Sequence, residues 1–473
     1  MEVYHQIEET DGIRMTWNIL PNSKQAASKL VIPPAVCYTP FIPREFPDLG
    51  IYQPIRCTNC SAILNPFTQI EQNGAFTCLF CLYKNMIPNQ VLQSLQGNPL
   101  PETHPSYTTN EFTIKQALPL SLIFIIDLSI LDQELQALKQ SILALLQVLP
   151  ESTQIGLITC HKHVFIHDLS DTLIPRCYAF KAKEYTSQQF SQILRFNPSG
   201  ANNSTSGIFL GPLHQVEYQF INCIEALKPS PWTTATDQRF ETCTGTALQC
   251  AVLLLEQLVP KTAARLLTFI GGPCTYGPGC IVDIPLKQHL RSHHDIDKET
   301  ATHYKKAIQF YDQLAKKASD NGHVIDLYTG CLDQVGLAEM RNCASFTNGV
   351  MVLSDSFNTS IFRQSLLKCY MGDPLEFGCC CQLQVHCSTS LKLNGCIGNC
   401  QSGNKKSVCV SDTQIGIGNT SLYTMGSIRQ NSTYCFYFEP STQSGATTGY
   451  IQFTTQFQQN DLIKLRVTTV ARK

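Results

Sequence analysis

The chain has 473 residues, too many for one ordinary hydrophobic core, and this length predicts about three or four domains. Its 43% apolar residues are typical of a globular protein, and its formal charge of −1 excludes a general electrostatic attraction to nucleic acid. Positive charge is local: segments 261–317 and 401–473 each carry +4 (nine Lys and Arg against five Asp and Glu, then seven against three), so the remaining residues sum to −9.

Neither a secretory signal nor a membrane span is expected. The first eleven residues hold four acids and lack the basic and apolar regions of a signal peptide, which favours a cytosolic location. The longest apolar candidate, residues 118–131, is interrupted by Asp127 and falls short of the roughly 20 residues of a spanning helix. Any membrane contact is therefore expected to be peripheral. The 23 cysteines lie mostly in apolar segments, which indicates buried, reduced thiols and not a disulfide framework.

Residues 1–50 are predicted to supply the N-terminal part of an antiparallel β-sandwich. They contain one candidate strand, IRMTWNIL (13–20), and a proline-rich linker after Ile32. Their texture resembles that of residues 373–473, which consist of short runs of alternating polarity separated by turn residues. We therefore expect the two ends of the chain to share one sandwich, with the other modules inserted between its halves.

Residues 51–105 are predicted to form a zinc finger. Two Cys-x-x-Cys hooks, Cys57 with Cys60 and Cys78 with Cys81, fit four thiolates around one Zn²⁺ at about 2.3 Å per bond. Four thiolates leave no position for a reacting water, so we expect a structural role; chance spacing or a redox pair is the alternative. Residues 61–77 contain no Lys or Arg to neutralise phosphate, which argues against nucleic-acid binding.

Residues 115–372 alternate between strand and helix patterns. The predicted strands include SLIFIID (121–127), IGLITC (155–160), KHVFIHDL (162–169), ARLLTFIGG (264–272) and HVIDLYTG (323–330). The predicted helices include residues 132–149, 245–259 and 303–322. Strands separated by helices of this length predict a mostly parallel, doubly wound sheet covered on both faces.

A ligand site is conceivable at Asp127-Leu128-Ser129, because open α/β sheets bind ligands at the carboxyl ends of their strands. The stretch resembles the Asp-x-Ser-x-Ser start of a von Willebrand A metal site, and Thr242 with Gly245 matches the middle motif of that fold. Leu131 replaces the second Ser, however, and Gly271 with Gly272 stands where a second acid is needed. With too few hard oxygen ligands, we expect no metal here.

Two further clusters have a chemical and a structural interpretation. RSHHDID (291–297) combines a cation, two imidazoles and two carboxylates, but no nucleophile motif accompanies it, so we favour a structural or interface loop over acid/base catalysis.

Cys396-x3-Cys400 lies among seven cysteines from 379 to 409. Its spacing suits a metal poorly, and we favour buried strand positions over a second metal site.

Several collinear blocks resemble the Sec twenty-three type subunits of the COPII inner coat. They are GIRMTWNILP (12–21), SAILNPF (61–67), LIFIIDLS (122–129), GLITC (156–160), LRSHHDID (290–297), HYKKAIQFYDQLA (303–315), NGHVIDLYTGCLDQVG (321–336), IGIGNTS (415–421) and KLRVTTVA (464–471). The resemblance implies a split β-sandwich, a zinc finger and a von Willebrand A type trunk. These modules agree with those predicted from the residues alone.

The resemblance also implies a cytosolic protein on the endoplasmic-reticulum membrane and on COPII vesicles. Its implied partners are a Sar-family small GTPase, a Sec twenty-four type cargo adaptor, outer-coat subunits and an anionic membrane, and no nucleic acid. The family activates the GTPase with an arginine finger from a gelsolin-like module that follows the sandwich. This sequence stops at Lys473, where the helical and gelsolin-like modules would begin.

We therefore expect this chain to act as a scaffold and not as an enzyme, because an arginine finger is worth roughly 10³–10⁵ in rate. Whether the chain is a truncated form of a longer protein stays open. Two rival interpretations remain. In one, another arginine makes the chain a complete GTPase activator; in the other, the hooks form a nucleic-acid-binding zinc ribbon, against which the lack of Lys and Arg in the stretch 61–77 argues.

Overall fold

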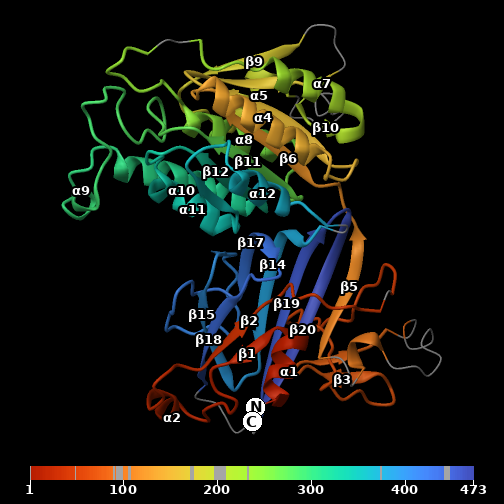
Figure 1. Ribbon diagram of the computed structural model, residues 1–473. Coiled ribbons are helices and arrows are strands. Elements are labelled where there is room, and N and C mark those ends of the chain that lie inside the picture. The colour runs from red at the N-terminus through yellow and green to blue at the C-terminus, as the bar shows by residue number, and fades with distance from the viewer. Residues whose placement is uncertain are drawn as a thin grey trace. The chain divides into compact units, whose positions relative to one another are not determined.

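The computed structural model describes residues 2–47, 49–88, 91, 100–104, 108–170, 175–196, 209–231, 234–372, 375–441 and 448–473. The chain divides into two units (Figure 1). One is Leu118–Cys380, and the other combines Met1–Ala117 with Cys381–Lys473. Two of the expected domain limits, at residues 105 and 373, fall outside the described residues. No helix among these residues has the length and apolarity to cross a membrane.

The first unit, the trunk, is built on one sheet of the order β13-β12-β11-β6-β7-β8-β9, with β10 paired to β7. Its strands are β6 (Ser121–Asp127), β7 (Gln154–Cys160), β8 (His163–Asp168), β9 (Arg176–Lys181), β10 (Gly211–Pro212), β11 (Ala264–Ile270), β12 (His323–Gly330) and β13 (Met351–Ser354). The run from β13 to β7 is parallel, whereas β8, β9 and β10 are antiparallel. The predicted mostly parallel sheet is confirmed.

Helices cover both faces of this sheet, as Figure 1 shows. They are α4 (Asp132–Leu146), α5 (Ser187–Leu194), α7 (Leu213–Ala226), α8 (Thr244–Leu258), α9 (His293–Asp297), α10 (Tyr304–Asp320), α11 (Leu337–Thr347) and α12 (Ser360–Lys368). One buried apolar cluster joins the sheet to α5, α8, α10 and α11, and the other joins it to α4, α7 and α12. The central strands β6 and β11 are buried along their whole length, which explains their continuous apolar sequence.

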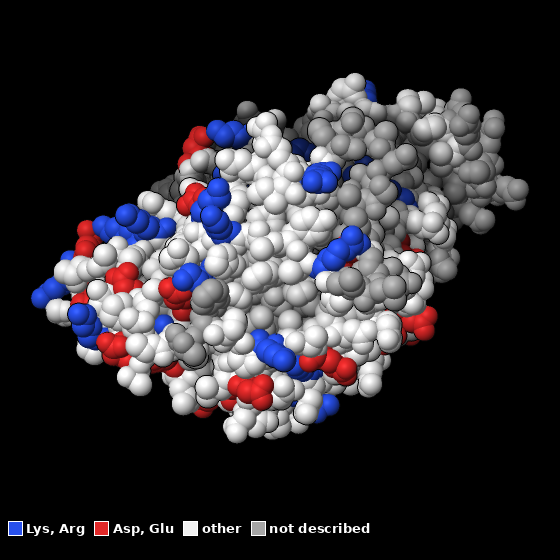
Figure 2. Space-filling view, turned by 90° about the horizontal axis from the view of Figure 1, so that it is seen from above, with Lys and Arg blue, Asp and Glu red and all other residues white. Residues whose placement is uncertain are grey.

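Fewer Lys and Arg side chains of segment 261–317 are unpaired than its net charge suggested. Of the nine Lys and Arg in segment 261–317, four lie in ion pairs: Arg265 with Asp326, Arg291 with Glu339, Lys305 with Glu299 and Lys317 with Glu256. Three of those four acids lie outside the segment, so its net charge of +4 overstates the unpaired charge. Figure 2 accordingly shows Lys and Arg mixed with Asp and Glu on the face it draws.

The second unit contains an antiparallel sandwich with sheets of the order β1-β2-β18-β15 and β16-β17-β14-β19-β20-β5. Its strands are β1 (Ile13–Met15), β2 (Ala35–Tyr38), β5 (Thr109–Gln116), β14 (Phe377–Cys387), β15 (Leu391–Ile397), β16 (Gln401–Ser402), β17 (Leu422–Arg429), β18 (Tyr434–Pro440), β19 (Gly449–Gln459) and β20 (Leu462–Arg472). The core lies between the sheets, where the Tyr38 and Phe453 rings stack with their centroids 4.4 Å apart.

The N-terminal segment contributes to both sheets, so the split sandwich is confirmed, but in a different form from the one expected. β2 pairs with β18, and β5 pairs with β20. The sequence analysis had not identified β2 or β5 as strands. The expected strand 13–20 is limited to β1, and the acidic start forms a helix, α1 (Glu2–Asp11), followed later by the short α2 (Lys24–Ser28).

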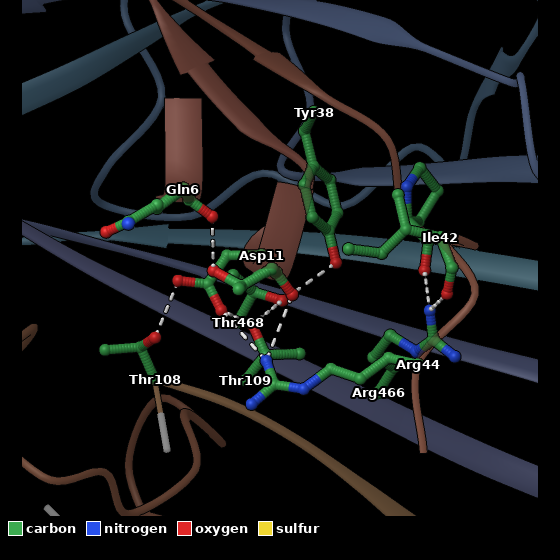
Figure 3. Close-up of polar contacts among 11 residues, drawn as sticks. Gln6, Asp11, Tyr38, Ile42, Arg44, Thr108, Thr109, Arg466 and Thr468 are labelled. Carbon is green, nitrogen blue, oxygen red and sulfur yellow. Dashed lines mark hydrogen bonds and ion pairs between the residues drawn. The ribbon is translucent and has the colours of Figure 1, made fainter. Parts of the chain in front are cut away.

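Asp11 fastens the N-terminal segment to this sandwich (Figure 3). Its carboxylate accepts hydrogen bonds from the hydroxyls of Thr108 and Thr109, each at 2.7 Å, and pairs with Arg44 at 3.2 Å. On β20, the strand next to β5, the Arg466 guanidinium donates to the carbonyls of Pro40 and Ile42, both at 2.9 Å. Side chains from three distant parts of the chain therefore meet in one network.

Candidate metal centre

The two cysteine hooks form two turns of the same shape. The Ser61 N–H donates to the Cys57 carbonyl and the Leu82 N–H to the Cys78 carbonyl, both at 2.9 Å. Ser61 and Leu82, each four residues after the first Cys of its hook, have φ values of 65° and 60°. Leu in this left-handed conformation is strained, which is typical of sites where surrounding structure fixes the backbone. The second turn lies between β3 (Ala75–Thr77) and β4 (Lys84–Met86), which form a hairpin.

The turns bring the four sulfurs together. Cys57 Sγ lies 3.6 Å from Cys81 Sγ, Cys60 Sγ lies 3.6 Å from Cys78 Sγ, and all four atoms lie within 4.8 Å of one another. A tetrahedral zinc site with bonds of about 2.3 Å has sulfur–sulfur edges of about 3.8 Å. The residues present therefore fit a closed four-thiolate site for structural zinc.

The electrostatics of the cluster favour a thiolate before any metal arrives. A hydrogen bond from the Cys60 thiol lowers the pKa of Cys78 to about 5, and the backbone N–H groups of Cys81 and Phe80 act in the same direction. The same bond, together with burial, raises the pKa of Cys60. A divalent cation would displace the remaining thiol protons, because metals bind thiolates and not thiols. Cys60 and Cys78 would then both be thiolates, and their pKa values would no longer shift in opposite directions.

Asn85 is a positioning residue that the sequence analysis missed. Its buried side-chain amide donates to Cys57 Sγ at 3.5 Å and to the Tyr83 carbonyl at 2.9 Å, while its Oδ1 accepts from the Thr58 N–H at 2.9 Å. It therefore joins both turns and orients one sulfur. The sequence signal was a lone Asn four residues after the second hook, which is indistinguishable from an ordinary turn residue.

The finger is docked on strand β19 of the same unit. The Gln452 amide accepts from the Ile63 N–H at 2.7 Å and donates to the Ile63 carbonyl at 2.8 Å, so it pairs with the finger backbone as a neighbouring strand would. Next to it, the rings of Phe67 and Tyr450 lie 5.9 Å apart. The finger therefore acts as a rigid extension of the sandwich.

The Asp127 carboxylate is engaged in hydrogen bonds within the trunk. Asp127 is 1% exposed and accepts hydrogen bonds from the Ser129 N–H, the Thr242 hydroxyl and the Gly271 N–H at 2.9, 3.1 and 3.3 Å. Burial raises the pKa of this carboxyl. A Cβ at Gly271 would meet the Ile130 side chain at 1.8 Å, so an apolar group fills the space of the missing acid. Among the described residues, Asp127 belongs to no cluster of three or more potential ligands.

RSHHDID forms the helix α9 and its attachment to the trunk. Arg291 makes two hydrogen bonds to the Glu339 carboxylate, at 2.9 and 2.6 Å, and Ser292 with Asp295 forms a capping box. His293 and His294 are exposed. The hydrogen bonds therefore hold this segment as a structural element of the trunk.

Cys396 and Cys400 are buried in the sandwich core at 0% and 2% exposure; Cys396 lies in β15, whereas Cys400 follows the end of that strand. Neither belongs to a cluster of three or more potential ligands within the described ranges. The structure instead brings Cys280, Asp283 and His303 together in the trunk, a grouping that the sequence analysis did not anticipate.

Three family models match the chain in order. The Sec23/Sec24 zinc finger matches residues 54–90, the Sec23/Sec24 trunk domain residues 117–370, and the Sec23/Sec24 beta-sandwich domain residues 378–473. The trunk match alone covers more than half of the 473 residues. This chain belongs to the Sec23/Sec24 family. Its domains are the zinc finger, the trunk and the beta-sandwich of that family.

One solved structure shares this fold over nearly the whole chain. The human COPII-coat protein Sec24c is 17% identical, with a TM-score of 0.68 over 98% of this chain and 60% of that one. A von Willebrand factor type A protein from Catenulispora acidiphila is 10% identical, with a TM-score of 0.39 over 76% of this chain and 68% of that one. The chain thus spans about 60% of the length of the Sec24c chain that it matches.

Proposed function

We propose that this Sec23/Sec24 family chain is a Sec twenty-three type subunit of the COPII inner coat, serving endoplasmic-reticulum-to-Golgi transport. The observation that carries the proposal is the joint occurrence of the three family domains with blocks such as LRSHHDID (290–297), which resemble Sec twenty-three type subunits. In the structure this block is held by the Arg291–Glu339 pair and by the α9 capping box, so it presents a fixed surface.

The proposed partners are a Sec twenty-four type adaptor, bound through the trunk, a Sar-family GTPase in its GTP-bound state, and outer-coat subunits. The proposed location is the cytosol and the cytosolic face of the endoplasmic-reticulum membrane and of COPII vesicles. Membrane contact is peripheral and depends on the GTPase, because ion pairs within the trunk leave fewer cations for an anionic leaflet than the sequence count gives.

Residues 1–473 are proposed to act as a scaffold and not to stimulate GTP hydrolysis. Three of their arginines are engaged with buried carboxylates: Arg265 with Asp326, Arg291 with Glu339 and Arg466 with Glu111. Arg472 ends β20, where its backbone pairs with Gly449 and its guanidinium donates to the Ala471 carbonyl at 2.8 Å. A side chain held in this way is poorly placed to reach a transferring phosphoryl group.

One structural Zn²⁺ per chain is proposed at Cys57, Cys60, Cys78 and Cys81. The finger has only small apolar clusters, so metal binding would provide much of its folding free energy. Since Gln452 couples the finger to β19, the ion would also support this sheet of the sandwich.

Co-purification with partners from the same organism tests the proposal. The chain should form a one-to-one complex with the Sec twenty-four type adaptor and none with a second Sec twenty-three type subunit. It should float with liposomes only when the GTP-bound Sar-family protein is present. Pairing with a Sec twenty-three type subunit instead would make this chain an adaptor, and binding to neither would remove it from the inner coat.

A single-turnover assay tests the absence of catalysis. Adding the 473-residue chain to the GTP-loaded Sar-family protein should leave the hydrolysis rate unchanged within a few-fold. Stimulation to within about tenfold of a complete activator, or about 1.4 kcal/mol of barrier, would place a catalytic arginine among residues 1–473.

A further inference from the structure

Three side chains that could bind a metal ion meet in the trunk, and none of them belongs to the zinc finger. Cys280 and Asp283 lie on the connection after β11, and His303 is the residue that caps the N-terminus of α10. Each offers one ligand atom, and the three atoms lie within 4.8 Å of one another. His303 Nε2 lies 3.2 Å from a carboxylate oxygen of Asp283.

The backbone that carries Cys280 and Asp283 is held in place. Between them, Ile281 and Val282 are 5% and 4% exposed, and the Ile281 N–H donates to the Cys274 carbonyl at 2.7 Å. On one side of this pair the Tyr311 hydroxyl, from α10, donates to the Gly279 carbonyl at 2.9 Å. On the other side the Arg239 guanidinium donates to the Asp283 carbonyl at 3.3 Å.

The Nε2 atom of His303 is available to bind a cation. Its Nε2 is buried and makes no hydrogen bond with any described residue, although the Asp283 carboxylate is at ion-pair distance. The side chain of Asp283 is 45% exposed, so solvent and ions reach the cluster from its carboxylate side. An unsatisfied imidazole nitrogen beside a carboxylate and a thiol is an arrangement that a cation would complete.

The chemistry of the three groups selects the kind of ion. One thiolate, one carboxylate and one neutral imidazole supply a charge of −2 and one ligand each of sulfur, oxygen and nitrogen, which suits Zn²⁺ and not the hard ions Ca²⁺ or Mg²⁺. Tetrahedral zinc with bonds of about 2.0–2.3 Å needs ligand atoms roughly 3.3–3.8 Å apart. The 3.2 Å between His303 Nε2 and the Asp283 carboxylate is near this range, and the Cys280 sulfur lies within 4.8 Å of both, so side-chain rotations would bring the three atoms around one ion.

We propose that Cys280, Asp283 and His303 bind a second Zn²⁺, whose fourth position is open to water. The Cys280 thiol now donates to the Val282 carbonyl at 3.4 Å. Binding would replace that hydrogen bond by a sulfur–zinc bond and release the thiol proton to solvent. With three protein ligands, this ion should exchange with solution more readily than the ion in the four-thiolate finger.

Metal analysis of the full chain tests the site. After equilibration with buffered Zn²⁺ under reducing conditions, the wild-type chain should hold two zinc ions and Cys280→Ser or His303→Gln only one. Cys60→Ser should lose a different ion, so the double variant Cys60→Ser/Cys280→Ser should hold none. His294→Gln, which changes an exposed histidine of α9 outside the cluster, should keep both.

Cobalt provides a second readout that is independent of stoichiometry. When Co²⁺ is added to the chain with a zinc-loaded finger, a thiolate-to-cobalt charge-transfer band should appear, and Cys280→Ser should abolish it while His294→Gln should not. Asp283→Asn, which keeps the shape of the side chain, should weaken Co²⁺ binding at least tenfold with the melting temperature of the metal-free trunk unchanged.

A single zinc ion in wild type and in each trunk variant, with no cobalt band that depends on Cys280, would overturn the proposal. That result would make the Asp283–His303 contact an ordinary ion pair at the start of α10. The outcome does not depend on whether the chain is a coat subunit, because only the metal content and the spectrum are measured.

Discussion

Arg265 of β11 and Asp326 of the neighbouring strand β12 form an ion pair that is completely buried. Two hydrogen bonds join them, Nε to Oδ2 at 2.8 Å and Nη2 to Oδ1 at 2.7 Å, and both side chains are 0% exposed. The Val350 N–H also donates to Asp326 at 2.7 Å, and the guanidinium lies 5.0 Å from the centre of the Phe377 ring. The pair thus connects the middle of the sheet to the segment that leaves the trunk.

Removing one member should strongly destabilise the trunk, because the other charge would stay buried without its partner. We expect Asp326→Asn to lower the free energy of unfolding by about 3–5 kcal/mol in urea denaturation. Arg265→Lys should lose nearly as much, because an ammonium cannot reproduce the two parallel bonds. Lys305→Ala, which breaks the exposed pair with Glu299, is the matched control and should have no resolvable effect. Equal effects for buried and exposed pairs would contradict this account.

The sequence predicted the trunk well because its signals are local. Continuous apolar strands such as 121–127, each followed by an amphipathic helix, determine a parallel layered sheet with little further information. Arg265 lies inside such a strand, and its acceptability there depends on Asp326, a partner 61 residues away. No local pattern reveals that partnership.

The sandwich was less predictable for the same reason. β2 has only four residues and β5 is mostly polar, and they are strands because β18 and β20, more than 340 residues later, provide their hydrogen-bond partners. The four cysteines that the structure brings together in the finger could be predicted because both hooks have a fixed spacing. The Cys280, Asp283 and His303 cluster has no such spacing, and Asn85 and Gln452 act only through folded neighbours.

Asn85 should determine how tightly the finger holds zinc. Asn85→Ala removes the hydrogen bond to Cys57 Sγ and the connection to Thr58, so we expect a 10–100-fold loss of zinc affinity in competition with a chelator. Cys60→Ser should lose the finger zinc altogether. Gln72→Ala, at an exposed position of the turn before β3, should bind zinc as wild type does. Wild-type affinity in Asn85→Ala would show that the hydrogen bond to sulfur is dispensable.

His323 should make the trunk sensitive to acid. Its Nε2 lies 3.0 Å from the Val259 carbonyl, which can only accept, so Nε2 carries the proton and Nδ1 is the site of protonation. Nδ1 is buried without a hydrogen-bond partner among the described residues, and burial lowers the pKa of His323 to about 4. In the unfolded chain the pKa of this imidazole is about 6.5, so the unfolded state takes up the proton first as the pH falls. The free energy of unfolding is therefore undiminished above pH 6.5 and decreases as the pH falls toward 4.

At pH 5 this linkage should cost the trunk about 2 kcal/mol relative to pH 7.5. His323→Gln should reduce the acid-induced loss by that amount in urea denaturation at the two pH values. Burial also lowers the pKa of His167 to about 4, so the variant should retain part of the effect. His294→Gln, at an exposed position, should show the full wild-type loss. If His323→Gln had the same pH dependence as wild type, the His323 imidazole of the wild-type chain would have to take up a proton as readily in the folded as in the unfolded state.

Mg²⁺ should not bind at Asp127 and should not change the stability of the trunk. Both carboxylate oxygens already accept hydrogen bonds, Oδ1 from the Ser129 N–H and Oδ2 from the Gly271 N–H. Ile130 fills the space beside Gly271 where a second acidic ligand would be needed. Millimolar Mg²⁺ should therefore leave the melting temperature of the zinc-loaded chain unchanged, with no chelator added so that the finger keeps its ion. A rise with Mg²⁺ that disappears in Asp127→Asn would contradict this prediction.

Asp127→Asn should nevertheless destabilise the trunk, because Asp127 acts as a structural acceptor. Asparagine has one carbonyl oxygen, so its NH₂ group would face either the Gly271 N–H or the Ser129 N–H, and one buried donor would lose its acceptor. We expect a loss of about 1–3 kcal/mol in urea denaturation, the usual cost of an unsatisfied buried polar group. Asp355→Asn, at an exposed position of the same unit, is the matched control and should be close to wild type. If Asp127→Asn were as stable as that control, the hydrogen bonds to Asp127 would contribute nothing to folding, and a role for this carboxylate in binding an ion or a partner would have to be reconsidered.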